Sequence, residues 1–280
     1  MNLDLTNSIG EDVEKSKIDS LIKIAEEAGD SIMKIYETDF DHERKKDNSP
    51  LTVADLASNK IICESLKNLT PKIPILSEEN SYIPFEERSL WNEYWLIDPL
   101  DGTKEFINKN GEFTVNIALI RNHEPIFGLI YAPALHQIFW GCEDHGSFMK
   151  SSKDKAKELF TSNQANKPIR VVSSRSHKSK DLSEFLNNLD DYIEDSLGSS
   201  LKLCLVASGE ADLYPRFGKT SEWDIAAGHA IIKFAGGLIT DMMGKDIKYN
   251  LKEDLINPNF FAACTLSLVK EIVRKAKLFS

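Results

Sequence analysis

The segment from Trp95 to Phe106 constrains the fold of this chain more strongly than any other, because it sets two acids at the end of a buried strand. Tyr94 to Ile97 are aromatic and aliphatic residues without a breaker, which predicts a short buried strand. Asp98 and Asp101 follow this strand. Two hard anions close together at a strand end are typical of a site for a divalent cation.

Between and after these acids, the sequence has the composition of a rigid corner. Pro99 fixes a backbone dihedral, Gly102 allows a sharp turn, and Thr103 offers a hydroxyl at the N-cap position of a short predicted helix. The carboxylates and the carbonyl of Leu100 could converge on a cation, while the N–H groups of Gly102 and Thr103 hold an anion. The alternative is a structural turn, because Asp-Pro-x-Asp-Gly is also a favourable turn sequence.

The composition limits the class of protein but does not define its substrate. The chain has 280 residues, of which 41% are hydrophobic, and this suits one large or two modest domains. Its formal net charge of −10 argues against a general nucleic-acid-binding surface, which needs a basic field. A small phosphorylated ligand is compatible with that charge, because bound metal ions reverse the local field.

The cysteines and the N-terminus predict the compartment. Four cysteines without a C-x-x-C pair predict buried free thiols in a reducing environment. The polar N-terminus carries no secretion signal, and no apolar run approaches the roughly 18 residues that cross a bilayer. We therefore expect a cytoplasmic protein without a transmembrane segment, peripheral at most at the inner face of the membrane.

Apolar periodicity divides the chain into an extension and two domains. Residues 1–15 form the predicted extension, residues 16–160 an N-terminal α+β domain, and residues 168–280 a C-terminal α/β domain. In the first domain we expect helices over 18–36 and 52–69 and strands over 73–76, 94–97, 113–121, 126–131 and 137–141. In the second we expect strands over 170–174, 191–197, 212–216, 237–240 and 260–264 and helices over 180–188, 199–208, 223–234 and 267–277. A polar link is expected over 39–49, a loop over 80–92, and a surface linker or hairpin tip over 151–167.

Other acids also lie at the ends of predicted elements. Glu78 and Glu79 close a strand, and Asp224 opens a helix after Trp223. Acids at strand ends and helix starts can gather at one edge of a layered fold, where ligand sites lie. Each also has a simpler explanation: a solvated strand exit for the glutamates, and an acid that complements the helix dipole for Asp224.

Asp55 has two competing interpretations. The segment 52–55, Thr-Val-Ala-Asp, resembles a capping box with a shortened acid, which gives Asp55 a local role. The functional alternative is that Asp55 orients Thr103 or a metal-bound water as a base. The six histidines build no competing metal site, because none has H-x₃-H or HExxH spacing.

Taken together, the motifs resemble those of the inositol monophosphatase superfamily of metal-dependent phosphatases, and specifically its CysQ-type 3′(2′),5′-bisphosphate nucleotidases. The first half contributes the segments 47–55, 76–79, 95–107, 110–120 and 128–133, and the second half contributes 174–177, 198–202, 213–218 and 223–230. The similarity extends from about residue 18 to the end of the chain. Two ordered signatures more than a hundred residues apart make it highly specific.

The resemblance implies an α+β fold, a layered αβαβα sandwich, with two or three Mg²⁺ ions between its halves. One ion would be held by Glu78, Asp98 and the Leu100 carbonyl, and a second by Asp98, Asp101 and Asp224. The first ion would activate a water and the second would stabilise charge on the leaving oxygen.

The same resemblance assigns the catalytic roles. It implies that Asp55 and Thr103 position the attacking water, and that the scissile phosphate lies on the backbone of residues 101–103. A third, weaker ion would lie near Asp55 and Glu78. Inhibition by lithium is implied in the same way.

The implied substrate is 3′-phosphoadenosine 5′-phosphate, cleaved to AMP and phosphate, or its sulfated form, which would link the chain to sulfur metabolism. Inositol monophosphatases usually carry an acid shortly before the Trp-Asp pair, whereas this chain has Arg216 there, with Lys202 and His177 upstream. Cationic groups suit a second phosphate, and the alternative is that Lys202 and Arg216 are surface charges. The full set of implied substrate contacts is Glu78, Leu100, Asp101, Gly102, Thr103, His177, Lys202, Arg216 and Asp224.

Two other functions stay open at this point. A broader phosphatase for inositol monophosphate or sugar phosphates would use the same acids. A non-catalytic Mg²⁺-dependent binder of phosphonucleotides fits less well, because the whole set of acids and Thr103 is intact. In each case the partner is a small phosphorylated molecule and not a nucleic-acid polymer, and no feature of the sequence sets the oligomeric state.

Overall fold

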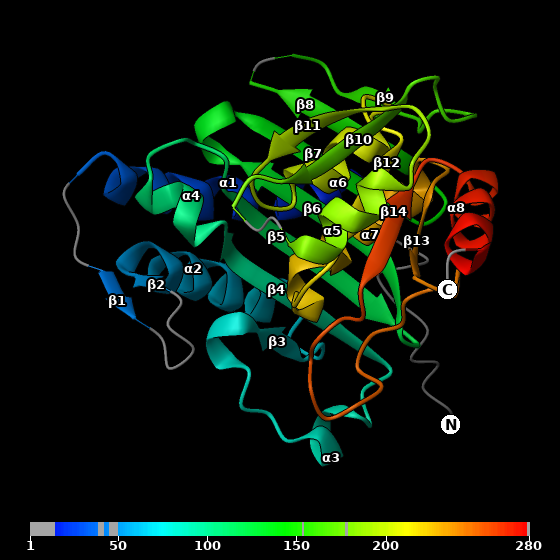
Figure 1. The fold of residues 1–280 in the computed structure, drawn as a ribbon. Helices are drawn as coiled ribbons and strands as arrows, with labels where there is room; N and C mark the ends of the chain where they lie inside the picture. The colour runs from blue at the N-terminus through cyan, green and yellow to red at the C-terminus, as the bar shows by residue number, and fades with distance from the viewer. Residues whose placement is uncertain (1–14, 39–41, 45–49, 153, 177–178, 279–280) are drawn as a thin grey trace.

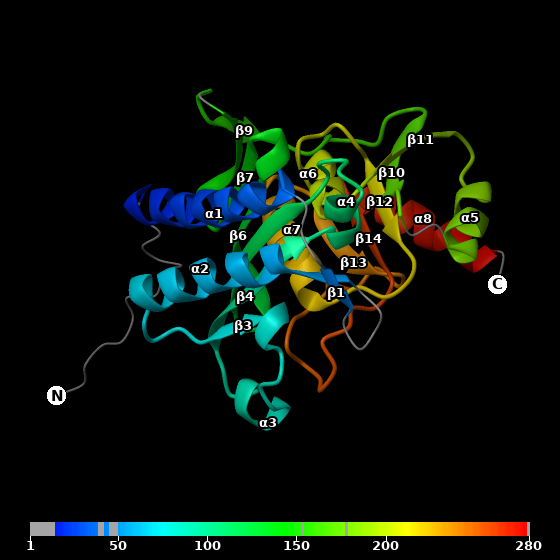
Figure 2. The same cartoon turned by 90° about the vertical axis from the view of Figure 1, so that its left-hand side faces the viewer.

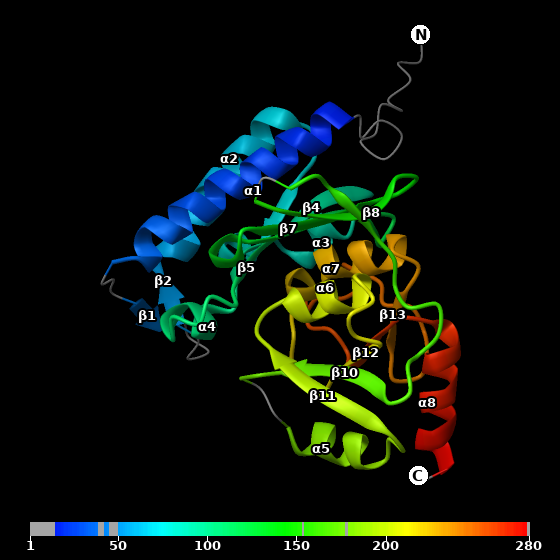
Figure 3. The ribbon, with the colours of Figure 1, turned by 90° about the horizontal axis from the view of Figure 1, so that it is seen from above.

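A computed structural model describes residues 15–38, 42–44, 50–152, 154–176 and 179–278. These residues form five stacked layers in the order helix, sheet, helix, sheet, helix (Figure 1). Seen from above in Figure 3, two long helices cover one side of the larger sheet, and two more separate it from the smaller sheet. The αβαβα sandwich expected from the sequence is confirmed.

The larger sheet has seven strands within the described residues, in the order β3-β4-β5-β6-β7-β8-β9. Their bounds are Ile75–Ser77 (β3), Glu93–Asp101 (β4), Thr114–Arg121 (β5), Glu124–Ala132 (β6), Gln137–Cys142 (β7), Gly146–Ser151 (β8) and Lys157–Leu159 (β9). β3 and β4 run parallel, and the remaining neighbours are antiparallel. The strand order follows the chain order, as in a meander joined by short turns.

Helices α1 (Lys15–Tyr36) and α2 (Val53–Leu69) cover the outer face of this sheet. α1 presents one apolar stripe to it, from Leu21 through Ala28 to Ile32, and these residues are fully buried. α2 also fixes the strand ends by hydrogen bonds. Its Ser58 Oγ donates to the Pro99 carbonyl at 2.7 Å, and Ser77 Oγ donates to the Asn59 side chain at 2.7 Å.

The inner helices α6 (Leu201–Ala207) and α7 (Glu222–Phe234) lie between the two sheets. The smaller sheet has the order β11-β10-β12-β14-β13 in the part of the chain described. Its strands are Ile169–Ser174 (β10), Tyr192–Leu197 (β11), Leu213–Arg216 (β12), Leu238–Asp241 (β13) and Phe260–Ala263 (β14). Helices α5 (Lys180–Asn187) and α8 (Leu266–Leu278) cover its outer face.

Several expected loops contain secondary structure. β1 (His42–Arg44) lies within the expected polar link over 39–49 and pairs antiparallel with β2 (Pro50–Thr52). The expected loop over 80–92 contains a short helix, α3 (Phe85–Arg88). Part of the expected linker over 151–167 is β9, which extends the larger sheet by pairing with β8. The link over 39–49 and the loop over 80–92 are therefore not free of secondary structure, because pairing and burial of the backbone override a polar composition. The antiparallel pairing of β8 with β9 fits the hairpin alternative for 151–167.

The expectations for the cysteines, the N-terminal extension and the domain boundary have different outcomes. All four cysteines are free and buried, as expected. No helix in the described residues has the length and apolar character needed to span a bilayer. The N-terminal extension, apart from Lys15, lies outside the described residues. The domain boundary between residues 160 and 168 and the cytoplasmic location stay predictions.

Candidate functional site

Asp98 and Asp101 lie at the end of β4, which continues through both residues instead of ending at Ile97 as expected. Asp98 pairs with Asn116 and Asp101 pairs with Thr114, so β4 has one residue more than β5 in this interval. This β-bulge accommodates Pro99, which cannot donate to a neighbouring strand. It also brings both carboxylates to one face of the sheet, whereas residues three apart in a regular strand point to opposite faces.

The chain then enters a short helix, α4 (Thr103–Ile107), with Gly102 at the N-cap. Thr103 is therefore the first helical residue and not the N-cap that the sequence suggests. Gly102 has a φ of 90°, and a Cβ there would lie 3.1 Å from the Glu112 carbonyl and 3.2 Å from Cβ of Ser199. Only glycine fits this position, because its backbone is left-handed and the second half of the chain packs directly on it.

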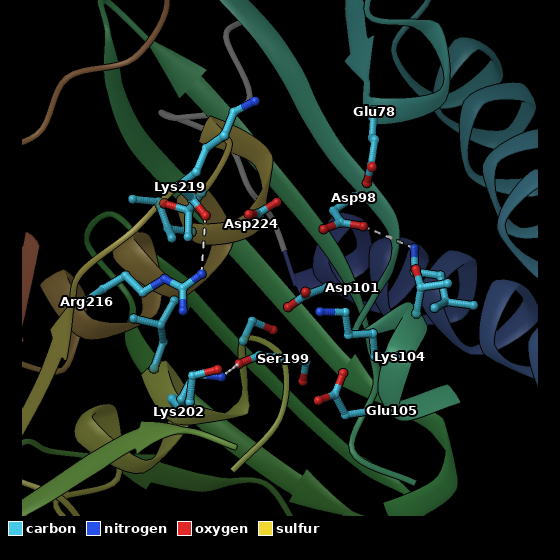
Figure 4. Close-up of a pocket in the computed structure, with 18 of the residues that line it drawn as sticks. Glu78, Asp98, Asp101, Lys104, Glu105, Ser199, Lys202, Arg216, Lys219 and Asp224 are labelled. Carbon is cyan, nitrogen blue, oxygen red and sulfur yellow. Dashed lines mark hydrogen bonds between the residues drawn. The ribbon is translucent and has the colours of Figure 1, made fainter. Parts of the chain in front are cut away.

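These elements surround a cavity of about 270 Å³ between the two sheets. Figure 4 shows four acids gathered on one side of it, with Lys104 beside Asp101. Glu78, Asp98, Asp101 and Asp224 lie together, and Arg216 and Lys202 lie across from them. The cavity is also lined by Leu100, Gly102, Thr103, Lys104, Glu105, Ser174, Ser199, Ser200, Leu203, Tyr214, Lys219, Thr220 and Ile225.

The acidic side concentrates negative charge in a place with little solvent. Burial raises the pKa of Asp98 well above its usual range, and the charge of Glu78 raises it further. Burial raises the pKa of Asp101 to about 6, against the opposing effect of Lys202. The pKa of Asp224 is raised by burial and by Asp101. Such a cluster is stabilised when a cation joins it.

Asp224 contributes to the start of α7 and also lines the cavity, so its two interpretations are compatible. It is the third residue of α7, and its Oδ2 accepts a hydrogen bond of 2.9 Å from the N–H of Ser221, which completes a capping box. The same carboxylate lines the cavity. The start of α7 thus places the Asp224 carboxylate in the same cavity as the acids of β4.

The donor set fits Mg²⁺ in its chemistry. Four carboxylates and the Leu100 carbonyl are hard oxygen ligands, which this ion prefers. Among the described residues, no three acidic, histidine or cysteine side chains stand in an arrangement that could already hold a metal ion. Rotation of the carboxylates would therefore have to accompany binding, and the ligand assignment stays a prediction.

Asp55 lies in the first turn of α2 and is 1% exposed. Its charge contributes to the raised pKa of Asp98, which places it beside the acidic cluster. The capping alternative for Asp55 depends on the side chain of Thr52, which lies outside the described residues. Catalytic roles for Asp55 and Thr103 stay predictions.

The basic side of the cavity is built by buried cations. Lys202 is 4% exposed, and its Nζ donates to the carbonyls of Ser199 and, at 3.2 Å, Leu197. Burial lowers the pKa of Lys202 to about 8, against the opposing charge of Asp101. Arg216 is 8% exposed, and its Nη2 donates to the Lys219 carbonyl at 3.2 Å. Both residues are therefore buried in the cavity wall, and the surface-charge alternative is wrong.

A polar floor connects the strands below the acids to the start of α6. Thr114 and Ser200 hydroxyl oxygens lie 2.8 Å apart, and Ser200 Oγ donates to Asn116 Oδ1 at 2.8 Å. All three residues are nearly fully buried. Because Thr114 and Asn116 pair with Asp101 and Asp98, this network fixes the backbone that carries the acids.

Sequence reasoning found the acids but missed several residues of the cavity. Lys104 and Glu105 directly follow the predicted corner, and Figure 4 shows Lys104 directed toward Asp101. Ser199 and Tyr214 fall within the segments that carry the resemblance, which was the available signal. His177, a predicted substrate contact, lies outside the described residues.

Comparison with known proteins gives a consistent result. The model of the inositol monophosphatase family matches residues 14–275. The 3′(2′),5′-bisphosphate nucleotidase CysQ of Salmonella typhimurium is 47% identical over 245 residues, which cover 87% of this chain and 98% of that protein. The protein of the same name from Escherichia coli K12 is 46% identical over the same shares. A crystal structure of CysQ from Bacteroides thetaiotaomicron, 38% identical, superposes with a TM-score of 0.79 over 90% of this chain and 98% of that one.

Proposed function

The chain belongs to the inositol monophosphatase family, and from that premise we propose that it is a Mg²⁺-dependent 3′(2′),5′-bisphosphate nucleotidase. It would hydrolyse the 3′-phosphate of 3′-phosphoadenosine 5′-phosphate to AMP and phosphate, and accept the sulfated nucleotide as well. One observation carries the proposal: the cavity has four carboxylates on one side and the buried cations Lys202 and Arg216 on the other.

The acidic side would bind the reacting phosphate through metal ions. Glu78, Asp98, Asp101, Asp224 and the Leu100 carbonyl would hold two or three Mg²⁺ ions. When bound, these ions supply an activated water and charge stabilisation for phosphate-ester hydrolysis. Without them the clustered carboxylates would repel a phosphate, so this side of the cavity suits a substrate only together with cations.

The chain's own residues then orient the reaction. Thr103 begins α4 and lines the cavity, and Asp55 is buried nearby, so the two can align the attacking water and take up its proton. The backbone of residues 101–103 enters the helix start, where N–H groups without intrahelical partners can donate to phosphate oxygens. Rigid support from the polar floor and from α2 keeps these groups aligned.

The basic side favours a bisphosphate over a monophosphate. Among the described residues, the Nε of Arg216 is buried and has no hydrogen-bond partner, so the guanidinium has donor capacity in reserve. An anion beside Arg216 and Lys202 would offset the cost of burying two cations. The position of these cations opposite the acids suits a ligand with phosphates at both ends.

A comparison of substrates tests the proposal. We expect Mg²⁺-dependent phosphate release from 3′-phosphoadenosine 5′-phosphate, and much slower release from inositol monophosphate and fructose bisphosphate.

Lys202→Ala should raise KM about 10- to 100-fold for the bisphosphate but little for 3′-AMP, because it removes a charge-assisted contact to the second phosphate. Lys202→Arg, which keeps the charge, is the matched control. Equal rates on all substrates would favour the broader phosphatase, and binding without release would favour a non-catalytic protein.

A further inference from the structure

A fully buried arginine joins two distant parts of the chain outside the cavity. Arg88, at the end of α3, is 2% exposed. Its Nη1 donates to Asn250 Oδ1, and its Nη2 donates to the carbonyls of Glu253 and, at 3.1 Å, Lys252. Asn250 Nδ2 in turn donates to the Arg88 carbonyl at 2.6 Å. Figures 1 and 2 both show α3 beside the loop that follows β13. We call this reciprocal pair the Arg88–Asn250 clasp.

The clasp continues directly to the first residue of α7. The N–H of Asn250 lies 3.0 and 2.9 Å from the two carboxylate oxygens of Glu222. Asn250 has a φ of 57°, a left-handed conformation that asparagine tolerates better than most residues. Glu222 is 2% exposed, and its own N–H donates to the Leu255 carbonyl at 2.8 Å. The loop after β13 thus binds the start of α7 through both the carboxylate and the backbone N–H of Glu222.

The position of the clasp in the fold relates it to the acidic cluster. α3 lies in the segment between β3, which Glu78 directly follows, and β4, which contains Asp98 and Asp101. The other end of the clasp holds α7 at Glu222, two residues before Asp224. The clasp is therefore a contact between the part of the chain that supplies three acids and the helix that supplies the fourth.

We propose that the Arg88–Asn250 clasp positions Asp224 against Asp98 and Asp101 and so sets the affinity of the site for divalent cations. The inference rests on the proposed function, because it concerns the same site. Arg88 and Asn250 are positioning residues: neither lines the cavity. Residues that orient metal ligands from outside typically change metal affinity about 10- to 100-fold when replaced.

Two variants remove the clasp in different ways. Arg88→Lys keeps the charge but loses the planar group that reaches three acceptors at once. Asn250→Gly removes the side chain, but it tolerates the left-handed backbone and keeps the N–H that binds Glu222. The matched control is Arg121→Lys, which weakens the ion pair of 2.9 Å between Arg121 and Glu93 at the far end of β4.

The experiment is a calorimetric titration of each full-length variant with MgCl₂, together with the activity at saturating Mg²⁺. We expect the Mg²⁺ dissociation constant to rise about tenfold in Asn250→Gly and Arg88→Lys and to stay at the wild-type value in Arg121→Lys. At saturating Mg²⁺, kcat should return to near the wild-type value, which a general loss of folded protein would not allow.

The outcomes separate the two proposals. A wild-type chain that binds no Mg²⁺ contradicts the proposed function. If the wild type binds Mg²⁺ and Asn250→Gly, folded by circular dichroism, binds it equally well, the clasp has no positioning role. A weakening of the same size in Arg121→Lys would also overturn the inference, because the effect would then not depend on the link to α7.

Discussion

At the scale of single residues, the interior of this protein contains polar groups whose ionisation is set by burial. His229 on α7 is 6% exposed, and its Nδ1 lies 2.9 Å from the Tyr249 hydroxyl. Burial lowers the pKa of His229 to about 3, and the charge of Lys233 lowers it further, against the opposing charge of Glu124. The imidazole is therefore neutral in the folded protein at physiological pH.

This burial predicts a loss of stability in mild acid. The unfolded chain takes up a proton at His229 near its ordinary pKa of about 6.5, whereas the folded chain does so only near 3. The contribution of His229 to the free energy of unfolding is therefore largest above about pH 6.5, and at pH 5 it should be smaller by about 2 kcal/mol. Urea unfolding of the wild type and His229→Asn at several pH values measures the difference. Parallel pH profiles for the two proteins would contradict the buried neutral imidazole.

Individual acids of the site could be predicted from sequence, but most of the other residues that line the cavity could not. Asp98 and Asp101 are recognisable because they directly follow an apolar strand. Glu105 and Tyr214 carry no such local signal, and they reach the same cavity only through the packing of distant elements. Lys202 could be named as a cation but not as a buried one, because burial is a property of the tertiary structure.

At the scale of elements, α7 packs closely against the middle of the larger sheet. A Cβ built on Gly128 of β6 would lie 2.1 Å from the Ala227 carbonyl oxygen of α7. Backbone therefore meets backbone at this crossing, and no side chain can move aside to make room. Glycine at this position sets how near the helix that carries Asp224 lies to the strands that carry the other acids.

Gly128→Ala should lower the free energy of unfolding by about 3 kcal/mol, the upper end of the usual cost of overpacking, because the contact is with backbone. Gly244→Ala is the control: it has a φ of 80° but its Cβ would lie 3.7 Å from Val269, so only backbone strain of about 1 kcal/mol is expected. Chemical denaturation of both variants tests the ranking. Equal losses would show that α7 can shift away from β6.

Long periodic helices and most of the short apolar strands could be predicted from sequence, whereas a four-residue helix and a bulge could not. The extents of α1 and α2 agree with the expected helices, because their apolar residues recur at helical spacing. α3 has only four residues, too few to show a period. The bulge of β4 has the composition of a turn, since Pro99 and Gly102 suit both, and only its pairing with β5 distinguishes them.

At the scale of the whole molecule, the site is assembled from both sheets and from the helices between them. Asp98 and Asp101 come from the end of β4, Glu78 begins the short 3-10 helix that follows β3, and Asp224 comes from the start of α7. The layer order followed only from the family resemblance, because periodicity describes each element without its neighbours in space. Cations bound among these four acids would connect these parts, so they should stabilise the fold as a whole.

Mg²⁺ should therefore raise the free energy of unfolding of the wild type, by about 2.7 kcal/mol when its concentration is about 100 times the dissociation constant. Asp98→Asn should abolish this gain while it leaves the protein without Mg²⁺ at least as stable, because it removes a charge from a buried acidic cluster. Asp195→Asn, at an exposed position on β11, is the control and should respond like the wild type. Thermal unfolding with and without Mg²⁺ measures this gain. A gain in Asp98→Asn equal to that of the wild type would show that Asp98 is not a ligand.

The late position of α7 in the chain has a consequence during synthesis. A polypeptide released from the ribosome before residue 222 would already have three of the acids, but it would lack the helix that completes them. On the proposed ligand assignment, such an unfinished product would lack one metal ligand and should not hydrolyse phosphate esters. On the same assignment, hydrolysis would begin only after α7 has been synthesised.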